Sequence, residues 1–357
     1  MKGIIIRQPG GPEVLKLEEG LPEPVCQAGH VKIRVYAVGV NHGLDTLAAR
    51  GAFGAVGTQS SEAFPRIPGA DLAGVVEEVG AGVSKVQPGD RVLSSVLVTC
   101  NKCRYCLSGR ENACPYQQIV GVHRDGGAAE SALLPERNVW PIPEGLSFIE
   151  AAAIPVSFGT AWQMLVDCAD VNADDWVLVV SAGSGLGVAG IQIAKLFGAR
   201  VIAAAGSDWK LERAKELGAD AVVNYSTEPL GERIREITQG EGVDIVFDGG
   251  INQNGWESYK DAISLYGRIV ICGTIGGGDG KLNLDIRQYY RRYQSFIGSA
   301  GYTAESYSRL LRQLGAKRLK PVIHKVLPLA QMAEAHAMLN RREVFGKVVL
   351  QVREDGK

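Results

Sequence analysis

Four cysteines within fifteen residues carry the clearest chemical signal in this sequence. The segment CNKCRYCLSGRENAC has the spacing C-x2-C-x2-C-x7-C, with thiols at Cys100, Cys103, Cys106 and Cys114. Thiolates at this spacing bind one Zn²⁺ tetrahedrally, and four sulfur ligands leave no position open for water or a substrate. The alternative is four core or redox thiols without a metal, but this polar, basic loop offers no apolar core. The segment therefore predicts one structural Zn²⁺ per chain, in a lobe spanning about residues 95–116.

A glycine-rich turn carries the second signal, in the segment VVSAGSGLGVAGIQIA. Such a turn, between an apolar strand and a helix, lets the backbone approach a pyrophosphate, and the helix N-terminus adds free N–H groups and a positive dipole end. A literal G-x-G-x-x-G occurs at Gly185, Gly187 and Gly190, but the strand is expected to end near Val180. We therefore expect Gly190 to pack the helix on the sheet. The residues expected to bind a dinucleotide are Ala182, Gly183, Ser184, Gly185, Leu186 and Gly187.

The end of the next strand, in VIAAAGSDWKLER, bears on which dinucleotide is bound. A carboxylate there would bind the ribose hydroxyls of NAD and repel the 2′-phosphate of NADP. The expected acid position is Ala205, so that carboxylate is missing. A hydroxyl, two positive charges and an aromatic ring lie nearby in sequence and favour NADPH: Ser207, Lys210, Arg213 and Tyr225. Two alternatives stay open, since the basic residues could simply solvate a helix face and Asp208 could favour NADH.

The elements that must position these residues fall into two regions. Residues 156–299 alternate apolar strands with amphipathic helices, which predicts a doubly wound parallel sheet covered on both faces. Residues 1–155 contain short β-like runs separated by Gly, Pro and Asn, typical of an irregular antiparallel region. The tail from residue 300 departs from the alternation and is expected to return to the first region. The prediction is an α/β protein with one domain from 1–155 and 300–357 and another from 156–299.

Composition and charge limit the classes of binding partner expected for this chain. The chain has 357 residues with a formal net charge of −1 and dispersed basic residues, which argues against nucleic acid and anionic membranes. No segment approaches the roughly 20 apolar residues of a membrane span. Four clustered cysteines and three scattered ones fit a reducing compartment better than a disulfide framework. We therefore expect a cytoplasmic protein with a small-molecule substrate.

Many ordered segments resemble the medium-chain dehydrogenase/reductase superfamily, and within it the zinc-binding quinone-oxidoreductase-like proteins. The resemblance covers essentially the whole chain and includes IPGADLAGVVEEVG, VQPGDRV, the four-cysteine loop, HRDGGAAE, AGSGLG and FGKVVL. It implies a GroES-like catalytic domain built from both ends of the chain, a Rossmann cofactor domain between them, and an active site in the cleft. It also implies a structural zinc in the four-cysteine lobe and a homodimer formed through the edge of the cofactor sheet. Loops such as residues 51–66 are expected to shape the substrate site.

The resemblance also shows what this chain lacks. Zinc-dependent relatives hold a catalytic zinc with an early Cys, a His in Gly-His-Glu and a later Cys, leaving one position open. Here the early Cys position is Asn41, the middle segment reads Gly69-Ala70-Asp71, and the later position falls at about Val156. Without a Lewis acid, hydride transfer to or from a simple alcohol loses much of its transition-state stabilisation.

An electron-poor acceptor relieves this difficulty. A quinone or an α,β-unsaturated carbonyl delocalises the incoming charge onto its own oxygen and needs only orientation and a hydrogen-bond donor. We therefore predict hydride transfer from NADPH to such an acceptor, with Asn41 donating to its oxygen, Asp45 ordering the site and Thr160 near the nicotinamide. Two alternatives stay open: a zinc-type alcohol dehydrogenase or carbonyl reductase with an unusual site, and a non-enzymatic NADPH-binding redox sensor whose zinc thiolates are oxidised.

Overall fold

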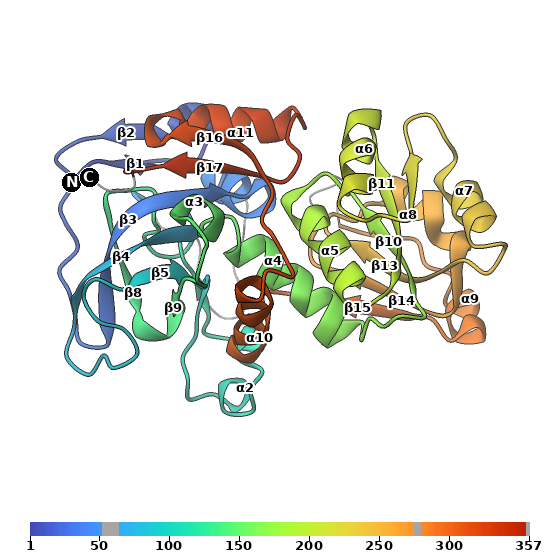
Figure 1. Cartoon of the computed structure of the whole chain (residues 1–357), viewed down its shortest axis with the longest axis horizontal. Helices are drawn as coiled ribbons and strands as arrows, with labels where there is room; N and C mark the ends of the chain where they lie inside the picture. The colour runs from blue at the N-terminus through green and yellow to red at the C-terminus, as the bar shows by residue number, and fades with distance from the viewer. Residues whose placement is uncertain (52–63, 275–279, 355–357) are drawn as a thin grey trace. The chain divides into compact units, whose positions relative to one another are not determined.

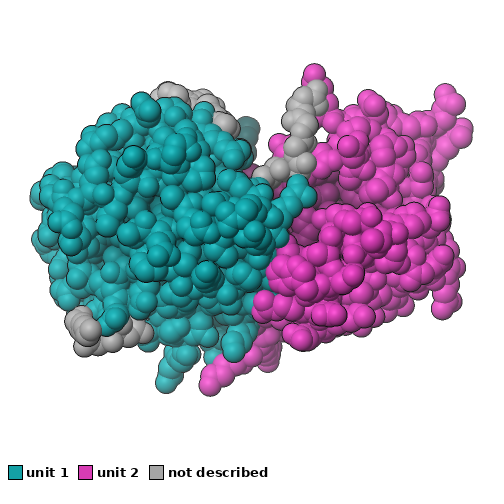
Figure 2. All heavy atoms as spheres, turned by 90° about the horizontal axis from the view of Figure 1, so that it is seen from above, with its two compact units in different colours: residues 1–157, 301–315, 320–357 teal, residues 158–300, 316–319 magenta. Residues whose placement is uncertain are grey.

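The computed structural model describes residues 1–51, 64–274 and 280–354. Residues 52–63, within the loop expected to shape the substrate site, lie outside this range. The chain divides into two compact units, coloured separately in Figure 2. Unit 1 comprises residues 1–157, 301–315 and 320–357, and unit 2 comprises residues 158–300 and 316–319. No helix of the described chain is long and apolar enough to cross a membrane.

Unit 2 contains a parallel six-stranded sheet in the order β12-β11-β10-β13-β14-β15 (Figure 1). Its central strands are buried on both faces, which explains their continuous apolar sequences. The strands are β10 (Trp176–Val180), β11 (Arg200–Ala205), β12 (Ala221–Asn224), β13 (Val243–Asp248), β14 (Ile263–Ile271) and β15 (Ser295–Gly298). The order reverses between β10 and β13, and such a reversal is where open α/β sheets bind their ligands.

The helices of unit 2 connect these strands. They are α5 (Gly185–Leu196), α6 (Asp208–Glu216), α7 (Leu230–Ile237), α8 (Gln253–Tyr259) and α9 (Ile286–Arg292). A further helix, α4 (Pro155–Trp162), continues into the π-helical η5 (Gln163–Cys168) ahead of β10. This arrangement confirms the predicted doubly wound fold.

Unit 1 is built on a seven-stranded sheet with the path β16-β17-β3-β4-β5-β9, and β8 pairs with β3 off this path. The strands are β3 (His30–Val40), β4 (Asp71–Val79), β5 (Arg91–Ser94), β8 (Ser131–Pro135), β9 (Val139–Pro141), β16 (Ile323–Pro328) and β17 (Lys347–Gln351). Two short hairpin-like pairs are β1 (Gly3–Ile5) with β2 (Lys16–Glu18) and β6 (Leu97–Val98) with β7 (Gln118–Ile119). This β-rich unit confirms the GroES-like part of the predicted fold.

Short helices complete unit 1. They are α1 (Leu47–Ala49), α2 (Arg104–Leu107), α3 (Phe148–Ala151), α10 (Ala304–Gly315) and α11 (Met332–Asn340), with short 3₁₀ turns at Pro12–Val14, Glu111–Ala113, Glu136–Asn138 and Leu329–Gln331. In unit 2, a 3₁₀ turn at Lys260–Ala262 leads into β14.

The core of unit 1 positions its polar residues through β3. Val31, Ile33 and Val35 alternate with more exposed neighbours and point into the core, as expected for a strand with one solvated face. From Ala37 to Val40 every residue is buried. The C-terminal end of β3 lies between β4 and β17, which both pair with it antiparallel (Figure 1). The residue that follows β3 therefore enters a buried position.

Candidate functional site

A buried polar cluster lies at one end of three neighbouring strands of unit 1. Asn41 follows β3, Asp71 begins β4 and Lys347 begins β17. The register pairs Val40 with Val348 and Gly39 with Asp71, so the three polar residues lie together at the same ends of these strands. The strand pairing, not closeness in sequence, brings these residues together.

The cluster is closely hydrogen-bonded. Lys347 Nζ lies 3.0 Å from Asp71 Oδ2 and donates to Asn41 Oδ1 over 2.6 Å. Asn41 Nδ2 donates to Asp71 Oδ2 over 3.0 Å, and the backbone N–H of Val156 donates to Asp71 Oδ1 over 2.9 Å. The side chains of Lys347 and Asp71 are 4% and 0% exposed. Such a pair is stable only when each charge has its partner, because neither is solvated by water.

Asp45 lies beside this cluster in the π-helical turn η2 (His42–Thr46). Its Oδ2 accepts from the backbone N–H of Asn41 at 2.7 Å and from Asn41 Nδ2 at 3.3 Å. Its Oδ1 is buried and has no hydrogen-bond partner among the described residues. Burial raises the pKa of Asp45 to about 7, and the charge of Asp71 also raises it. Asp45 can therefore hold a proton at neutral pH.

The four predicted zinc cysteines converge in unit 1. Their Sγ atoms all lie within 4.8 Å of one another, and Cys103 is 3.5 Å from Cys106 and 3.9 Å from Cys114. A tetrahedral Zn²⁺ with Zn–S bonds of about 2.3 Å requires S···S separations of about 3.8 Å. The backbone N–H of Lys102 lowers the pKa of Cys100 to about 6. The thiols therefore fit one zinc ion with no open coordination position.

No second group of three or more His, Cys, Asp or Glu side chains with this proximity occurs in residues 1–51, 64–274 and 280–354. Within the described chain, the cluster around Asp71 contains two carboxylates, those of Asp45 and Asp71.

The glycine-rich turn has the geometry expected of an anion-binding helix start. Ser184 is the N-cap of α5, and its Oγ accepts from the backbone N–H of Gly187 over 2.9 Å. A Cβ on Gly187 would lie 2.5 Å from the carbonyl oxygen of Ser181, so this close approach requires glycine. Gly190 lies against the ring of Phe247 on β13, which agrees with the expected packing role. Within the turn, the N–H groups of Ala182, Ser184 and Gly187 donate to the chain itself, which leaves those of Gly183, Gly185 and Leu186 to bind an anion beyond β10.

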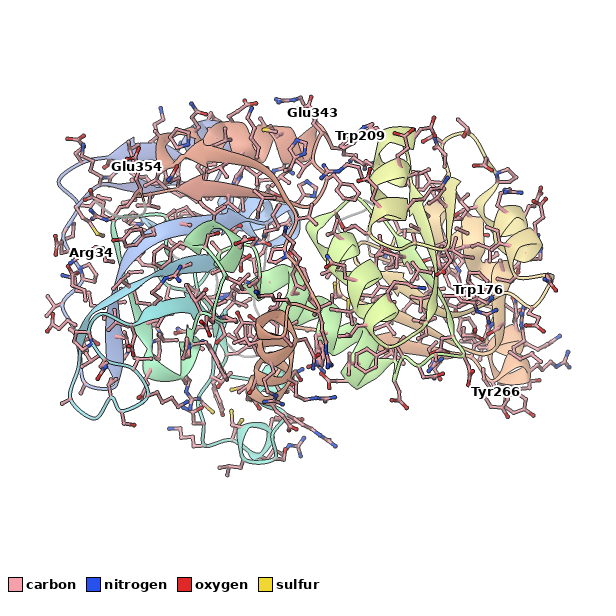
Figure 3. All side chains as sticks on the ribbon, viewed as in Figure 1. Arg34, Trp176, Trp209, Tyr266, Glu343 and Glu354 are labelled. Atoms are coloured by element: carbon pink, nitrogen blue, oxygen red, sulfur yellow. The ribbon has the colours of Figure 1, made fainter. Side chains whose placement is uncertain are left out.

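The predicted selectivity residues follow the neighbouring strands β11 and β12. The register pairs Ala205 with Asn224, which places Ser207 and Tyr225 just beyond the carboxyl ends of β11 and β12. Asp208 accepts a hydrogen bond from Asn224 Nδ2 at 2.6 Å, so its carboxylate is already engaged. On α6, Lys210 Nζ lies 5.3 Å from the ring centroid of Trp209, which is labelled in Figure 3.

The remaining predicted site residue, Thr160, lies on α4 in unit 2 and is half-buried. Asn41 and Asp45 belong to unit 1. The structure therefore brings Asn41 together with Asp45, and the four cysteines together with one another.

Comparison with known proteins identifies the family. Residues 185–316 match the zinc-binding dehydrogenase family, and residues 27–144 match the alcohol dehydrogenase GroES-like domain. The chain belongs to the medium-chain dehydrogenase/reductase superfamily. It is 30% identical to the quinone oxidoreductase of Rattus norvegicus, over 98% of this chain and 97% of that protein. It is 32% identical to the alcohol dehydrogenase of Geobacillus stearothermophilus, over 99% of this chain and 100% of that protein.

Solved structures lead to the same superfamily. A crystal structure of an NAD-dependent alcohol dehydrogenase is 44% identical, with a TM-score of 0.92 over 99% of this chain and 100% of that chain. A cobalt- and zinc-bound thermostable alcohol dehydrogenase from Pyrobaculum aerophilum is 32% identical, with a TM-score of 0.85 over 99% of each chain. The protein is therefore an NAD(P)H-dependent oxidoreductase.

The catalytic zinc of zinc-dependent members of this superfamily does not fit the residues present here. The three positions that the resemblance assigns to its ligands do come together, since Asn41 and Val156 both hydrogen-bond to Asp71, which follows Ala70. They offer an amide, a methyl group and an isopropyl group in place of two thiolates and an imidazole. The Asn41 amide is moreover engaged by Lys347 and Asp71. Protein zinc ligands are thiolates, imidazoles and carboxylates, and these three positions supply none of them.

Sequence reasoning did not identify Lys347 as part of the site. The segment FGKVVL contains a lysine at the start of an otherwise apolar strand, and a lysine within a buried run is unusual unless it is paired. That signal was present in the sequence. Its partner could not be inferred, because Asp71 is 276 residues away along the chain.

Proposed function

We propose that this protein transfers hydride from NADPH to a quinone or an α,β-unsaturated carbonyl without a catalytic metal. The observation that carries the proposal is the donor set around Asp71, where Asn41, Ala70 and Val156 stand at the zinc-ligand positions. Electron-poor acceptors are the substrates that least need a Lewis acid. The quinone oxidoreductase relatives support the same class of substrate.

Within this proposal, Asn41 and Asp45 prepare the site in unit 1. Both amide hydrogens of Asn41 are directed at carboxylates, and the longer bond, 3.3 Å to Asp45, is the one that an acceptor oxygen would replace. Burial raises the pKa of Asp45 to about 7, so Asp45 would supply the proton that balances the charge delivered with the hydride. Thr160 is assigned to the nicotinamide side.

NADPH selectivity is assigned to residues near the ends of β11 and β12. Lys210 and Arg213 would bind the 2′-phosphate, with Ser207 and Tyr225 beside it. The hydrogen bond from Asn224 Nδ2 to Asp208 Oδ1 supports this assignment, because it uses part of the acceptor capacity of that carboxylate. Bound NADPH supplies the hydride, and the turn from Ala182 to Gly187 would hold its pyrophosphate.

The wider assignments follow the same proposal. Residues 1–155 with 300–357 form the catalytic domain and residues 156–299 the cofactor domain, a division that the two compact units support. One structural zinc is held by the four cysteines. We assign the protein to the cytoplasm, as a homodimer formed at the edge strand β15. Exposed aromatic rings near that edge support the dimer, since Tyr266 (Figure 3) and Tyr293 stack with centroids 4.7 Å apart.

A zinc-type alcohol dehydrogenase is the second candidate. It is favoured by the solved NAD-dependent alcohol dehydrogenase at 44% identity and by the alcohol dehydrogenase of Geobacillus stearothermophilus. It requires a second zinc in each chain, and the donor set around Asp71 disfavours that second zinc.

The test is a steady-state screen of purified protein with NADPH and NADH against quinones, enones, aldehydes and simple alcohols, combined with a zinc count. We expect one zinc per chain and oxidation of NADPH by enones or quinones. Lys210→Ala with Arg213→Ala should raise KM for NADPH by about 10- to 100-fold and leave KM for NADH unchanged, because charged hydrogen bonds to the phosphate are lost. Two zinc ions per chain with oxidation of simple alcohols would establish the second candidate instead.

A further inference from the structure

Two stacked tyrosines in unit 1 differ in whether the hydroxyl hydrogen has an acceptor. Tyr302 and Tyr307 have ring centroids 4.9 Å apart and an interplanar angle of 25°. The hydroxyl of Tyr307, on α10, donates to the carbonyl oxygen of Ser94 over 2.9 Å. The hydroxyl of Tyr302 is buried, and no group in the described part of the chain accepts its hydrogen. Tyr302 as a whole is only 5% exposed. A buried donor without an acceptor is unfavourable and is uncommon unless it serves a function.

The tyrosine pair lies beside the polar cluster. Ser94, which binds Tyr307 through its carbonyl, uses its Oγ to donate to Ala70 O over 2.9 Å and to accept from Leu72 N at 3.1 Å. These contacts flank Asp71 in sequence. Burial raises the pKa of Tyr302 well above its usual value, and the negative charge of Asp71 raises it further. The phenol therefore keeps its proton at neutral pH and remains a donor.

Near Asp71, the Tyr302 hydroxyl oxygen is approached by the backbone N–H of Val96, but its hydrogen has no acceptor within the described chain, and Asp45 Oδ1 has no hydrogen-bond partner there. The amide hydrogens of Asn41, in contrast, are both directed at carboxylates. A ligand that brings an acceptor oxygen to this region would complete the hydrogen bonding of Tyr302 without breaking an existing bond. Carbonyl and quinone oxygens are acceptors of this kind.

We propose that Tyr302 binds the substrate, donating its hydroxyl hydrogen to the oxygen of the carbonyl or quinone acceptor. This inference rests on the proposed function, which supplies the class of substrate. As hydride reaches the acceptor, its oxygen gains negative charge, and a hydrogen bond to a charged oxygen is stronger than one to a neutral oxygen. Tyr302 therefore stabilises the transition state more than the bound substrate. It keeps its own proton, and the proton required by the product comes from another group.

The experiment compares Tyr302→Phe with the matched control Tyr307→Phe, since each removes one hydroxyl from the same stacked pair. For Tyr302→Phe we expect kcat/KM with NADPH and cyclohex-2-enone to fall about 10- to 100-fold, because a hydrogen bond to a charged oxygen is lost. KM for NADPH should stay unchanged. The midpoint of urea unfolding should fall less than in Tyr307→Phe, because the hydrogen of the Tyr302 hydroxyl has no internal acceptor and only its weak interaction with the Val96 N–H is lost. Tyr307→Phe should do the reverse, with a lower midpoint and nearly unchanged kcat/KM.

A binding measurement separates this inference from the proposed function. Cyclohexanone keeps the acceptor oxygen without the reactive alkene, so its affinity for protein saturated with NADP⁺ can be measured by calorimetry even if no acceptor is reduced. We expect it to bind at least about tenfold more weakly to Tyr302→Phe than to the wild type. Equal affinity, or no affinity in either protein, overturns the role of Tyr302. So does an unchanged kcat/KM in an active enzyme, or a Tyr302→Phe variant destabilised as much as Tyr307→Phe.

Discussion

Replacing Asp71 with Asn tests whether the buried cluster depends on charge. The substitution keeps the shape of the side chain and an oxygen for the backbone N–H of Val156, but it removes the charge opposite Lys347. At a separation of 3.0 Å, the Coulomb attraction is about 5 kcal/mol for an effective dielectric constant near 20. Breaking a buried pair by removing one partner costs about 3–5 kcal/mol, because the other charge is left without compensation. We therefore expect Asp71→Asn to lower the free energy of unfolding by an amount in that range.

The assay is equilibrium unfolding in urea, followed by circular dichroism at neutral pH. Glu334→Gln is the control, since it removes the charge from a pair with Arg341 in which both side chains are about half exposed, and such pairs contribute little. Adding Lys347→Met to Asp71→Asn should recover stability, because the uncompensated ammonium is then removed as well. The reasoning is refuted if Asp71→Asn unfolds at the urea concentration of the wild type, or if the second substitution destabilises it further.

Three further predictions follow from other parts of the structure. Removing zinc with a chelator should lower the midpoint of unfolding before it lowers the rate of NADPH oxidation, and a parallel loss of rate in still-folded protein would place a metal at the reacting centre. Burial raises the pKa of Asp45 to about 7, so between about pH 4 and 7 the folded state binds more protons than the unfolded state. The free energy of unfolding therefore falls as pH rises through this window. Asp45→Asn should remove that fall, as measured by urea unfolding across the window. Burial lowers the pKa of His336 to about 4, so its effect is opposite, and the free energy of unfolding falls as pH falls from about 6.5 to 4. His336→Leu should therefore unfold at a lower pH than the wild type. An unchanged acid midpoint would contradict the lowered pKa of His336.

The cofactor sheet could be predicted from the sequence because its physical signal is local. Strands covered on both faces must be apolar throughout, so segments such as VLVV in β10 and VIAAA in β11 stand out from the helices between them. The glycine-rich turn is equally local, since Gly187 is required by the approach of a backbone carbonyl only six residues away.

The cluster in unit 1 could not be predicted in the same way. Asn41 was predicted as a site residue from the resemblance, but Lys347 reaches it only because β17 pairs antiparallel with β3. That pairing joins segments about 300 residues apart, and its register decides which side chain enters the site. Tyr302 presents the same difficulty, because its significance lies in a missing acceptor, which no pattern of residue types reveals.

Charge balance explains why these particular residues occupy the place of a metal site. A zinc ion would supply positive charge to neutralise the groups around it, and without one the two carboxylates of Asp45 and Asp71 must be compensated by the chain itself. Lys347 neutralises Asp71 directly, at 3.0 Å. Asp45 has no cation within hydrogen-bonding distance in the described chain and is instead close to half protonated at neutral pH. With Asp71 paired to Lys347, protonation of Asp45 brings the cluster to neutrality without a metal ion.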